Sequence, residues 1–457
     1  MTTSRRSASP DPTLPAESET TVPHKLLVVS VDAMHHDDLP FARTLPAFSR
    51  ILEQAAVAEI EGVYPSVTYP NHTAQTTGCP PARTGIFNNL QFQPGRGDAS
   101  EWFWDARAIR VPTIFEAAHA AGLTVAAVQW PVTANERHVD WLVPEIASPQ
   151  VFDGLEDQYR RTTNAASLER YVLPNLHLVD VTGRKPRYYA FVNHVAEQIL
   201  RHERPDVMFV HLVEVDSARH AGGAHGPHVE QALREVDATL GTFLDALADT
   251  GDLGRTNIVL VSDHGHLDTE QHTNLNTIFV ERGLVRLDEA GRLLDYDVLC
   301  LGAGLSGQLF LAEGITPGRR AEVEALLAEI EATPEYRIER IWTAEETSRA
   351  HGLDGPFDYV VESEPGVVVG MLWDRRPVVR RGDDDFPPVL GNHGHAPRHG
   401  GQPLFVATGP DIAPGIDLGR RSMLDEAPTF AALLGVDLPH AEGTVLHELL
   451  TARPLPV

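Results

Sequence analysis

Short apolar runs rich in β-branched residues alternate with longer stretches of helical periodicity along most of the chain. Runs of the first kind, which predict buried strands, lie at residues 25–31, 123–129, 206–215, 257–261 and 403–408. Stretches of the second kind, which predict helices, lie at residues 45–57, 111–121, 187–203, 228–248 and 422–435. Continuous apolar runs are typical of strands that are buried on both faces, as in a parallel sheet. The pattern predicts an α/β fold with a doubly wound, mostly parallel central sheet and helices on both faces.

The pattern changes between residues 267 and 389. Glycine-rich pieces and a charged helical stretch at 318–332 separate short β-like runs at residues 307–311, 336–341 and 366–372. This mixture predicts a smaller α+β insertion that forms a cap over one end of the sheet. The expected organisation is a disordered tail (1–23), an α/β core (24–266 and 390–457) and the inserted cap subdomain (267–389).

The composition narrows the range of partners. The 457 residues include 37 Lys and Arg against 64 Asp and Glu, which gives a formal net charge of −27. Such an acidic surface argues against nucleic acid polymers and anionic membranes as partners. No apolar run reaches the length of a membrane span, and residues 1–23 hold no apolar signal segment, so we expect a cytoplasmic protein. The oligomeric state stays open.

Acidic residues and histidines follow three of the predicted strands. Asp32 ends the first run, Asp216 and His220 follow the run at 206–215, and Asp263 and His264 follow the run at 257–261. In a parallel sheet the carboxyl ends of the strands meet at one edge, where open α/β sheets bind ligands. Asp-x-x-x-His also places both side chains on one face if the segment is helical. Together these residue types favour a divalent metal centre.

A hydroxyl group lies near the same edge. In the stretch YPSVTYPNHTAQTTG, Thr68 precedes Pro70, and proline suits the first turn of a helix. Thr68 would then lie at a helix N-terminus, where free N–H groups and the dipole attract an anion. Such a threonine can be a nucleophile for a phosphoryl group, although a plain helix cap would look the same.

Two further features need interpretation. The pentapeptide CPPAR at 79–83 matches the sulfatase pattern in which cysteine is oxidised to formylglycine, but Cys79 follows a Thr-Gly pair that should come after it. We interpret this match as coincidental. The late segment GNHGHAPRH brings three histidines (His393, His395 and His399) within seven residues, which suits either a metal site or a polar loop.

These motifs, in this order, resemble the alkaline phosphatase superfamily, and most closely its type I phosphodiesterase / nucleotide pyrophosphatase branch. The resemblance runs from about residue 26 to residue 450. It rests on the segments VSVDAM, YPSVTYPNHTAQTTG with GIFNN, VEVDSARHAGGAHGP, VLVSDHGH and GNHGHAPRHGG.

The resemblance implies two zinc ions and a threonine nucleophile, with manganese as an alternative metal. It assigns one ion to Asp216, His220 and His393, and the other to Asp32, Asp263, His264 and the deprotonated Thr68. Asn71 is expected to donate a hydrogen bond to a phosphoryl oxygen, together with the backbone N–H of Thr68. His225, His266 and His395 have no counterpart. His266 could be a further ligand, but a supporting role beside a ligand or a place at the surface is favoured.

The implied reaction is hydrolysis of a small phosphoric ester through a phospho-threonine intermediate. A phosphodiesterase or nucleotide pyrophosphatase is favoured. A phosphomonoesterase and a phosphonate hydrolase on the same site are the alternatives, and a non-catalytic binding protein on the same scaffold is a hypothesis of another class. The substrate is not determined. Aromatic residues at 90–110 could stack on a base, line an apolar pocket or simply pack the cap.

Overall fold

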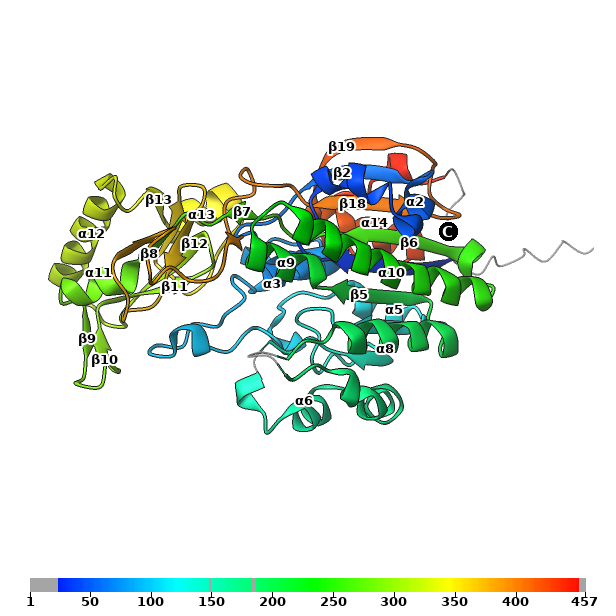
Figure 1. Ribbon diagram of the computed structural model, residues 1–457, viewed down its shortest axis with the longest axis horizontal. Helices are drawn as coiled ribbons and strands as arrows, with labels where there is room; N and C mark the ends of the chain where they lie inside the picture. Colours follow the sequence, from blue (N-terminus) through cyan, green and yellow to red (C-terminus); the bar gives the residue numbers. More distant parts are fainter. Residues whose placement is uncertain (1–23, 148, 183–185, 452–457) are drawn as a thin grey trace, which may run out of the picture.

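The computed structural model describes residues 24–147, 149–182 and 186–451, so the tail predicted at 1–23 lies outside the described residues. The chain forms two lobes that lie side by side (Figure 1). The larger lobe is built on an eight-stranded sheet, and the smaller lobe comes from the segment between strands β6 and β18. No helix in the described ranges is long and apolar enough to cross a membrane.

The central sheet has the strand order β19-β2-β18-β6-β1-β5-β3-β4. Its strands are β1 (Lys25–Val31), β2 (Ala56–Glu61), β3 (Val125–Val128), β4 (Trp141–Val143), β5 (Val207–Leu212), β6 (Thr256–Val261), β18 (Leu404–Thr408) and β19 (Asp417–Ser422). Every neighbouring pair is parallel except those of β18, which runs antiparallel to β2 and β6. The mostly parallel sheet predicted from the apolar runs is therefore confirmed.

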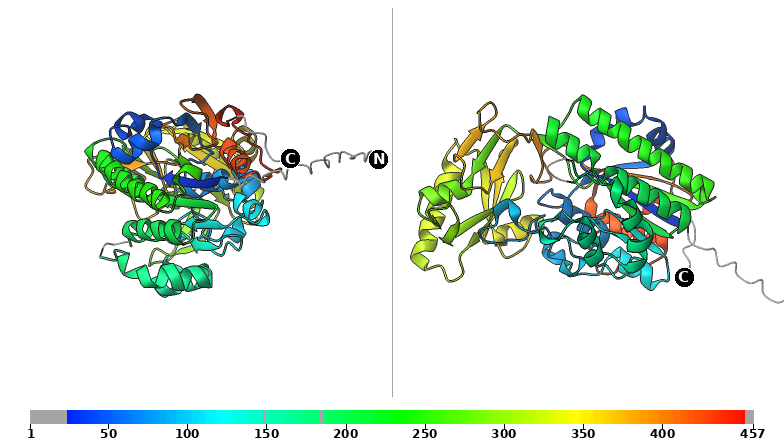
Figure 2. Two further views of the ribbon diagram at one scale, coloured as in Figure 1. Left: turned by 90° about the vertical axis from the view of Figure 1, so that its right-hand side faces the viewer. Right: turned by 60° about the horizontal axis from the view of Figure 1, so that its bottom comes forward.

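Alternate residues of the buried strands belong to two separate hydrophobic cores, one on each face of the sheet. Leu27, Val29 and Val31 of β1 pack on one face against the first group of helices, and Leu26 and Val28 pack on the other face against the second group. The first group includes α2 (Pro46–Leu52), α8 (Tyr189–His202) and α10 (Pro227–Asp249), and the second includes α3 (Thr68–Thr77), α5 (Ile114–Ala120) and α14 (Glu426–Leu434). Figure 2 shows this layering from two further sides. Helices cover both faces, as the continuous apolar runs require.

One predicted helix was too long. The helical pattern expected over 45–57 gives α2, which ends at Leu52, and strand β2 begins at Ala56. Burial alternates along β2, with Ala56, Ala58 and Ile60 inside. An alternating pattern over so few residues also fits a helical pattern, which explains why the sequence predicted a helix that was too long.

The smaller lobe has its own apolar core between helices and small sheets. A four-stranded antiparallel sheet has the order β11-β12-β14-β13, and a three-stranded sheet has the order β15-β8-β16. Their strands are β8 (Gln271–Asn274), β11 (Val298–Gly302), β12 (Ser306–Leu311), β13 (Ile338–Thr343), β14 (Tyr359–Ser363), β15 (Val367–Gly370) and β16 (Val378–Arg380). The remaining elements are β7 (Leu267–Asp268), α11 (Leu275–Glu281), β9 (Val285–Leu287), β10 (Leu293–Tyr296), α12 (Pro317–Ala332), α13 (Ala344–His351) and β17 (Gly391–Asn392). The short pair β7 and β17 stands where the chain leaves and re-enters the larger lobe.

Candidate metal centre

Three adjacent central strands bring the predicted acidic residues to one edge of the sheet. In the register of the sheet, Ser30 of β1 stands beside His211 of β5 on one side and Val261 of β6 on the other. Asp32 follows β1 and Asp263 follows β6, so both leave the sheet at the same level. Helix α9 (Glu214–Gly222) follows β5, and its helical turn brings Asp216 and His220 to one face, as the sequence predicted.

The nucleophile candidate lies at the start of helix α3. Val67 has an extended backbone and precedes the helix, so Thr68 is the first helical residue. The Thr68 hydroxyl lies 3.2 Å from His264 Nε2, and the side chain is buried. In the first helical turn, Tyr69 donates its N–H to Asn89 Oδ1, Asn71 donates its N–H to the carbonyl of Val67, and Pro70 has no N–H. The backbone N–H of Thr68 is therefore the group that this turn can offer to an anion.

The first ligand cluster, which we call the oxygen-rich cluster, consists of Asp32, Thr68, Asp263 and His264. His264 Nε2 lies 3.1 Å from Asp263 Oδ2, 3.2 Å from Thr68 Oγ1 and 3.5 Å from Asp32 Oδ1. One nitrogen therefore faces three oxygens. Zinc bonds of about 2.0–2.1 Å in a tetrahedron would separate ligand atoms by about 3.3 Å, and these distances fit that spacing.

The second, nitrogen-rich cluster consists of Asp216, His220, His266 and His393. Asp216 Oδ1 lies 3.3 Å from His220 Nε2, 3.4 Å from His266 Nε2 and 3.9 Å from His393 Nε2. One ligand atom from each of the four side chains falls within 4.8 Å of all the others. Here one oxygen faces three nitrogens, the reverse of the oxygen-rich cluster.

The pKa shifts of the buried side chains indicate that a bound positive charge would stabilise the two clusters. Burial, with the neighbouring charge of Asp216, raises the pKa of Asp32 to about 7, and burial also raises the pKa of Asp216 and of Asp263. Burial lowers the pKa of His264 and of His393 well below the usual value, which leaves these imidazoles neutral. Buried carboxylates next to neutral imidazoles are unfavourable alone and suit a bound divalent cation.

Several ligand atoms of both clusters are buried and lack a hydrogen-bond partner among the described residues. They are Asp32 Oδ1, Asp216 Oδ1, Asp263 Oδ2 and both ring nitrogens of His266. Buried polar atoms are nearly always paired in proteins. Unpaired oxygens and imidazole nitrogens at ligand spacing therefore fit metal ions, and the Asp/His donor set fits zinc.

Supporting contacts hold the ligands in orientation. His220 Nδ1 contacts the carbonyl of Gly391 at 2.9 Å, and His393 Nδ1 contacts the carbonyl of Ser66 at 3.1 Å. In each ring the Nδ1–H can donate to the carbonyl and leave Nε2 free to face the cluster. The backbone N–H of Ala33 donates to Asp263 Oδ1.

A histidine that the sequence analysis missed anchors Asp32. His211 of β5 is fully buried, with Nε2 at 3.0 Å from Asp32 Oδ2 and Nδ1 at 3.2 Å from Glu145. Burial lowers the pKa of His211, but hydrogen bonds to both carboxylates outweigh it, so the pKa stands well above its usual value. The only signal in the sequence was a polar residue inside an apolar strand.

The role expected for Asn71 has to be corrected. Its Nδ2 donates to the carbonyls of Pro65 (3.1 Å) and Val67 (2.8 Å), and its Oδ1 accepts from the N–H of Val63 (2.9 Å). The side chain is fully buried, and both of its N–H groups are already used. Asn71 therefore braces the turn before α3 and has no donor left for a phosphoryl oxygen.

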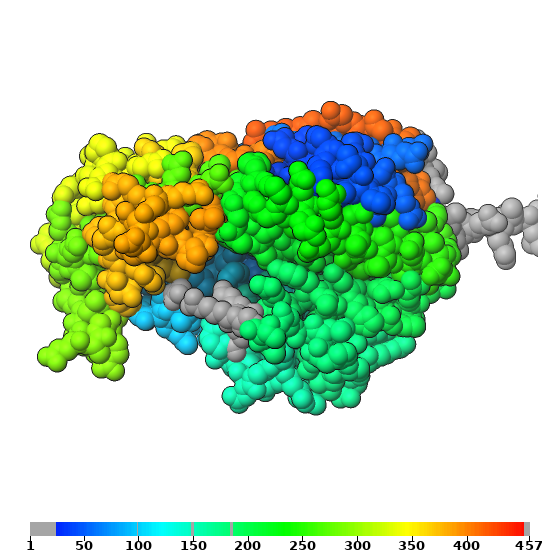
Figure 3. All heavy atoms as spheres, in the orientation of Figure 1, coloured from blue at the N-terminus to red at the C-terminus, as the bar shows by residue number. Residues whose placement is uncertain are grey.

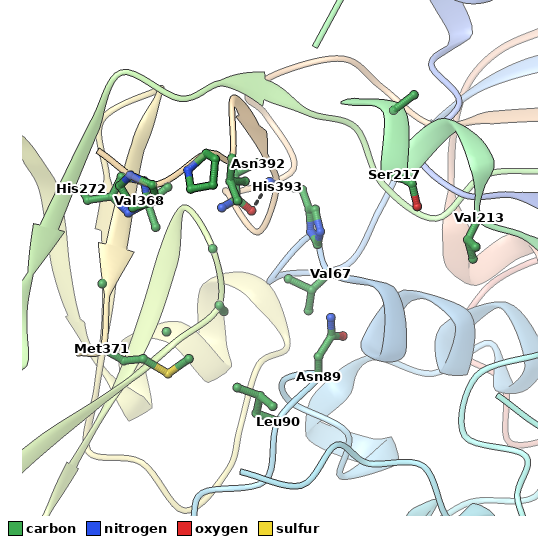
Figure 4. Close-up of a pocket in the computed structure, with 18 of the residues that line it drawn as sticks. Val67, Asn89, Leu90, Val213, Ser217, His272, Val368, Met371, Asn392 and His393 are labelled. Atoms are coloured by element: carbon green, nitrogen blue, oxygen red, sulfur yellow. Dashed lines mark hydrogen bonds between the residues drawn. The ribbon is translucent and has the colours of Figure 1, made fainter. Parts of the chain in front are cut away.

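Asn89 has the free donor that Asn71 lacks. Its Oδ1 accepts from the N–H of Tyr69 at 2.8 Å, and no hydrogen bond of its Nδ2 is formed within the described part of the chain. Figure 4 shows Asn89 on the wall of the cleft below Val67 and His393. It belongs to the segment GIFNN, which the resemblance included without assigning a residue.

The remaining histidines lie at different distances from the centre. For His266 a supporting or surface position was favoured over a ligand role, but the structure places it inside the nitrogen-rich cluster, 1% exposed. His395 is buried beside Gly400, and the ring of His225 packs edge-on against His35, 5.6 Å between centroids. Neither belongs to a ligand cluster of the described residues.

Cys79 does not behave as a modified or reactive residue. Burial raises the pKa of its thiol, and its Sγ contacts the carbonyl of His440 at 3.3 Å. It lies beyond the C-terminal end of α3, the opposite end from Thr68. This position agrees with interpreting the CPPAR match as coincidental.

A large cleft runs from the metal centre to the smaller lobe. Its volume is about 1270 Å³, and its lining includes Val67, Asn89, Trp102, Tyr189 and His393. The surface is hollowed between the smaller lobe and the helices of the larger one (Figure 3). The cleft is large enough for a nucleotide-sized ligand.

The aromatic residues at 90–110 divide between the two alternatives. Phe92 stacks on Phe310 of the smaller lobe at 3.7 Å, and Phe103 packs edge-on against Phe87 at 5.3 Å. Trp102 lines the cleft. Packing therefore accounts for both phenylalanines, Phe92 between the lobes and Phe103 within the larger lobe, whereas Trp102 lines the cleft.

Solved structures of known proteins share this fold. Murine ectonucleotide pyrophosphatase / phosphodiesterase 5 superposes with a TM-score of 0.64 at 20% identity, covering 93% of this chain and 100% of that one. Its human counterpart gives 0.64 at 19% identity, with 94% and 100% coverage. The likeness confirms the alkaline-phosphatase-like architecture.

Sequence comparison extends the likeness to a family. Ectonucleotide pyrophosphatase/phosphodiesterase family member 1 of Mus musculus is 25% identical over 260 residues, which cover 56% of this chain and 25% of the mouse protein. The Homo sapiens protein is 24% identical over 261 residues, covering 56% and 24%. The chain thus spans about a quarter of the length of these relatives. The family model for type I phosphodiesterase / nucleotide pyrophosphatase matches residues 26–375, so the chain belongs to this family, within the alkaline phosphatase superfamily.

Proposed function

We propose that this protein is a metal-dependent hydrolase of small phosphoric esters, of the phosphodiesterase / nucleotide pyrophosphatase type, with Thr68 as its nucleophile. The observation that carries the proposal is the position of the Thr68 hydroxyl. It lies at the first turn of α3, 3.2 Å from His264 Nε2, inside the oxygen-rich cluster, where Asp32 Oδ1 and Asp263 Oδ2 lack a hydrogen-bond partner among the described residues. Membership of the family supports the same reaction.

Two ions, zinc or alternatively manganese, would be held by the two clusters. Asp216, His220 and His393 would hold one, and Asp32, Asp263, His264 and Thr68 would hold the other. When bound, such ions supply positive charge that lowers the pKa of a nearby hydroxyl and offsets the charge of a phosphoryl group.

The protein's own groups would then bind and orient the ester. The Thr68 oxygen would attack phosphorus in line after its hydroxyl proton is lost to solvent, and the bond from phosphorus to the leaving oxygen would break and release the first product. Water would then attack phosphorus, break its bond to Thr68 and release the second product with the hydroxyl restored. The backbone N–H of Thr68 and the Nδ2 of Asn89 would offer N–H donors to the phosphoryl oxygens. His72 fixes the turn, because its Nδ1 contacts the carbonyl of Thr68 at 2.9 Å and its Nε2 contacts Ser30.

The cleft suits a nucleotide-like diester, with Trp102 available for stacking on a base. A second solved structure of the murine relative is that of an inactive threonine-to-alanine variant in complex with AMP. It supports a nucleotide-like ligand and the importance of a threonine. A phosphomonoesterase or phosphonate hydrolase on the same residues is the second candidate. The two clusters alone do not distinguish a phosphodiester from a phosphomonoester or a phosphonate. The domain boundaries 24–266, 267–389 and 390–457 and the cytoplasmic location stay predictions.

The test compares hydrolysis of bis-p-nitrophenyl phosphate and p-nitrophenyl phosphate by the zinc-loaded protein, with and without EDTA. We expect a preference for the diester that EDTA abolishes. Thr68→Ala should lower kcat by on the order of 10⁴-fold or more while zinc content stays unchanged. Thr73→Ala is the matched control, because Thr73 is a buried threonine of the same helix whose hydroxyl bonds the Tyr69 carbonyl. A preference for the monoester would select the second candidate, and full activity of Thr68→Ala would overturn the proposal.

A further inference from the structure

The nitrogen-rich cluster contains one histidine more than the resemblance to the family accounts for. We propose that His266 is a fourth protein ligand of the metal ion that Asp216, His220 and His393 would hold. This inference rests on the proposed function, because that function places an ion in this cluster. It goes further by making the two metal positions unequal.

The distances carry the proposal. His266 Nε2 lies 3.4 Å from Asp216 Oδ1, nearly the same as the 3.3 Å of His220 Nε2 and closer than the 3.9 Å of His393 Nε2. The edge of a tetrahedron around zinc is about 3.3 Å long. The rings are also splayed and not stacked, with 76° between His266 and His220 and 59° between His266 and His393. Three imidazoles arranged this way around one carboxylate oxygen can point their nitrogens at a common ion.

The alternative role for His266 is to orient Asp216 from outside. That role needs a hydrogen bond between the two side chains, yet His266 Nε2 and Asp216 Oδ1 each lack a hydrogen-bond partner within the described part of the chain. His266 Nδ1 is unpaired as well, and the side chain is 1% exposed. A buried imidazole with both nitrogens unpaired is costly, and a bound ion satisfies one of them.

The backbone around His266 is held so that its ring faces the cluster. The N–H of His266 donates to His35 Nε2 at 2.9 Å. The turn packs so closely that a Cβ at Gly265 would lie 1.8 Å from the carbonyl oxygen of Gly401. In this turn His264 reaches the oxygen-rich cluster while His266, two residues later, reaches the nitrogen-rich one.

Four protein ligands would complete a tetrahedral shell at the nitrogen-rich cluster. A phosphoryl oxygen could then reach that ion only if it accepts a fifth ligand, which zinc does at some catalytic sites. The oxygen-rich cluster has three ligands besides the reacting Thr68. We therefore expect the ion in the nitrogen-rich cluster to be retained longer under chelation.

The direct experiment is a crystal structure of the wild-type protein loaded with zinc, with the ions located by anomalous scattering. An ion bonded to Asp216 with His266 Nε2 at about 2.0–2.3 Å supports the proposal. An ion held by Asp216, His220 and His393 with His266 Nε2 beyond about 3 Å overturns it and leaves the proposed function standing. Absence of zinc from this cluster overturns both.

A variant tests the same point in solution. His266→Leu should raise the dissociation constant of one of two zinc ions by more than about 100-fold in competition with a chelator, because a residue that only orients a ligand costs about 10–100-fold. His272→Leu is the control, since His272 of β8 also has an unpaired ring nitrogen but belongs to no ligand cluster of the described residues. Equal zinc affinity of His266→Leu and wild type would overturn the proposal.

Discussion

Three groups of acidic residues and histidines come close together in the described part of the chain, and one of them differs from the other two. Glu339, Glu362 and His399 form a third cluster where the lobes meet. Glu362 accepts hydrogen bonds from Tyr64 Oη (2.7 Å) and from the N–H of Ala396 (2.8 Å). Glu339 is paired with Arg398 and His399. The oxygen-rich and nitrogen-rich clusters instead keep unpaired oxygens and nitrogens in the interior.

The difference indicates that unpaired buried atoms, and not spacing alone, distinguish a candidate metal site. Spacing alone brings all three groups within ligand distance. In the third cluster protein partners already satisfy the carboxylates, so its role is to join β14 of the smaller lobe to Tyr64 and Ala396 of the larger one. In the other two clusters the unpaired atoms suit a bound cation.

The largest effect is expected from removing one ligand of each metal cluster. Asp216→Asn and Asp263→Asn should each lose one zinc ion per chain, and turnover should fall on the order of a thousandfold, because a lost ion removes several kcal/mol of charge stabilisation. Glu362→Gln should keep both ions. Metal content by atomic emission, measured beside kcat, checks this. A zinc ion lost from Glu362→Gln would refute the criterion.

The two asparagines allow a paired and an unpaired side-chain donor to be compared within one residue type. Asn89→Asp keeps the acceptor for the Tyr69 N–H but replaces the free Nδ2 donor, so kcat/KM should fall by about 10²–10³-fold with little change in melting temperature. Asn71→Asp removes donors that two backbone carbonyls use, so it should lower the melting temperature. Steady-state kinetics and thermal unfolding of both variants distinguish the roles. If Asn71→Asp lowered kcat/KM and Asn89→Asp lowered the melting temperature instead, the roles assigned to the two asparagines would be wrong.

A smaller effect is expected where a histidine is fully paired beside a metal cluster. His211 bridges Asp32 and Glu145 and would orient Asp32 from outside. His211→Gln should weaken zinc binding at the oxygen-rich cluster by about 10–100-fold, and excess zinc should restore most of the activity. Chelator competition and a zinc titration of kcat measure both quantities. Activity that no zinc concentration restores would show that His211 does more than orient a ligand.

The sequence predicted the frame of the site well, for physical reasons. Strands such as β1 and β5 are continuous apolar runs, and acidic residues at their carboxyl ends must meet at one edge. The direction of β18 and the strands β2 and β19 escaped prediction, since a short alternating run carries no information on its neighbour. The pattern also placed Thr68 at a helix start, where α3 begins.

The roles of single polar side chains could not be predicted in this way. Asn71 and Asn89 both follow apolar segments, and only tertiary contacts decide which amide is free. His266 stands two residues after His264, and the packing of Gly265 against Gly401 decides that it turns inward. The contact between Gly265 and Gly401 joins residues more than a hundred positions apart, which a local sequence pattern does not show.

The smallest effect concerns the stability contributed by the third cluster. Burial raises the pKa of Glu362 to about 7, so the folded protein keeps this proton at pH values where the unfolded chain has released it. The stabilisation is complete below about pH 4.5 and is lost as the pH rises toward 7. Between pH 5 and pH 8, Glu362→Gln should therefore gain on the order of 1–3 kcal/mol of unfolding free energy relative to wild type. Urea unfolding at both pH values measures it, with Glu339→Gln as the surface control, for which a change of about 0–1 kcal/mol is expected. If the difference between Glu362→Gln and wild type did not change with pH, the carboxylate would be charged in the folded protein, and hydrogen bonds from Tyr64 and Ala396 would suffice to hold a buried charge. Unpaired atoms would then be the only property that separates the third cluster from the two metal clusters.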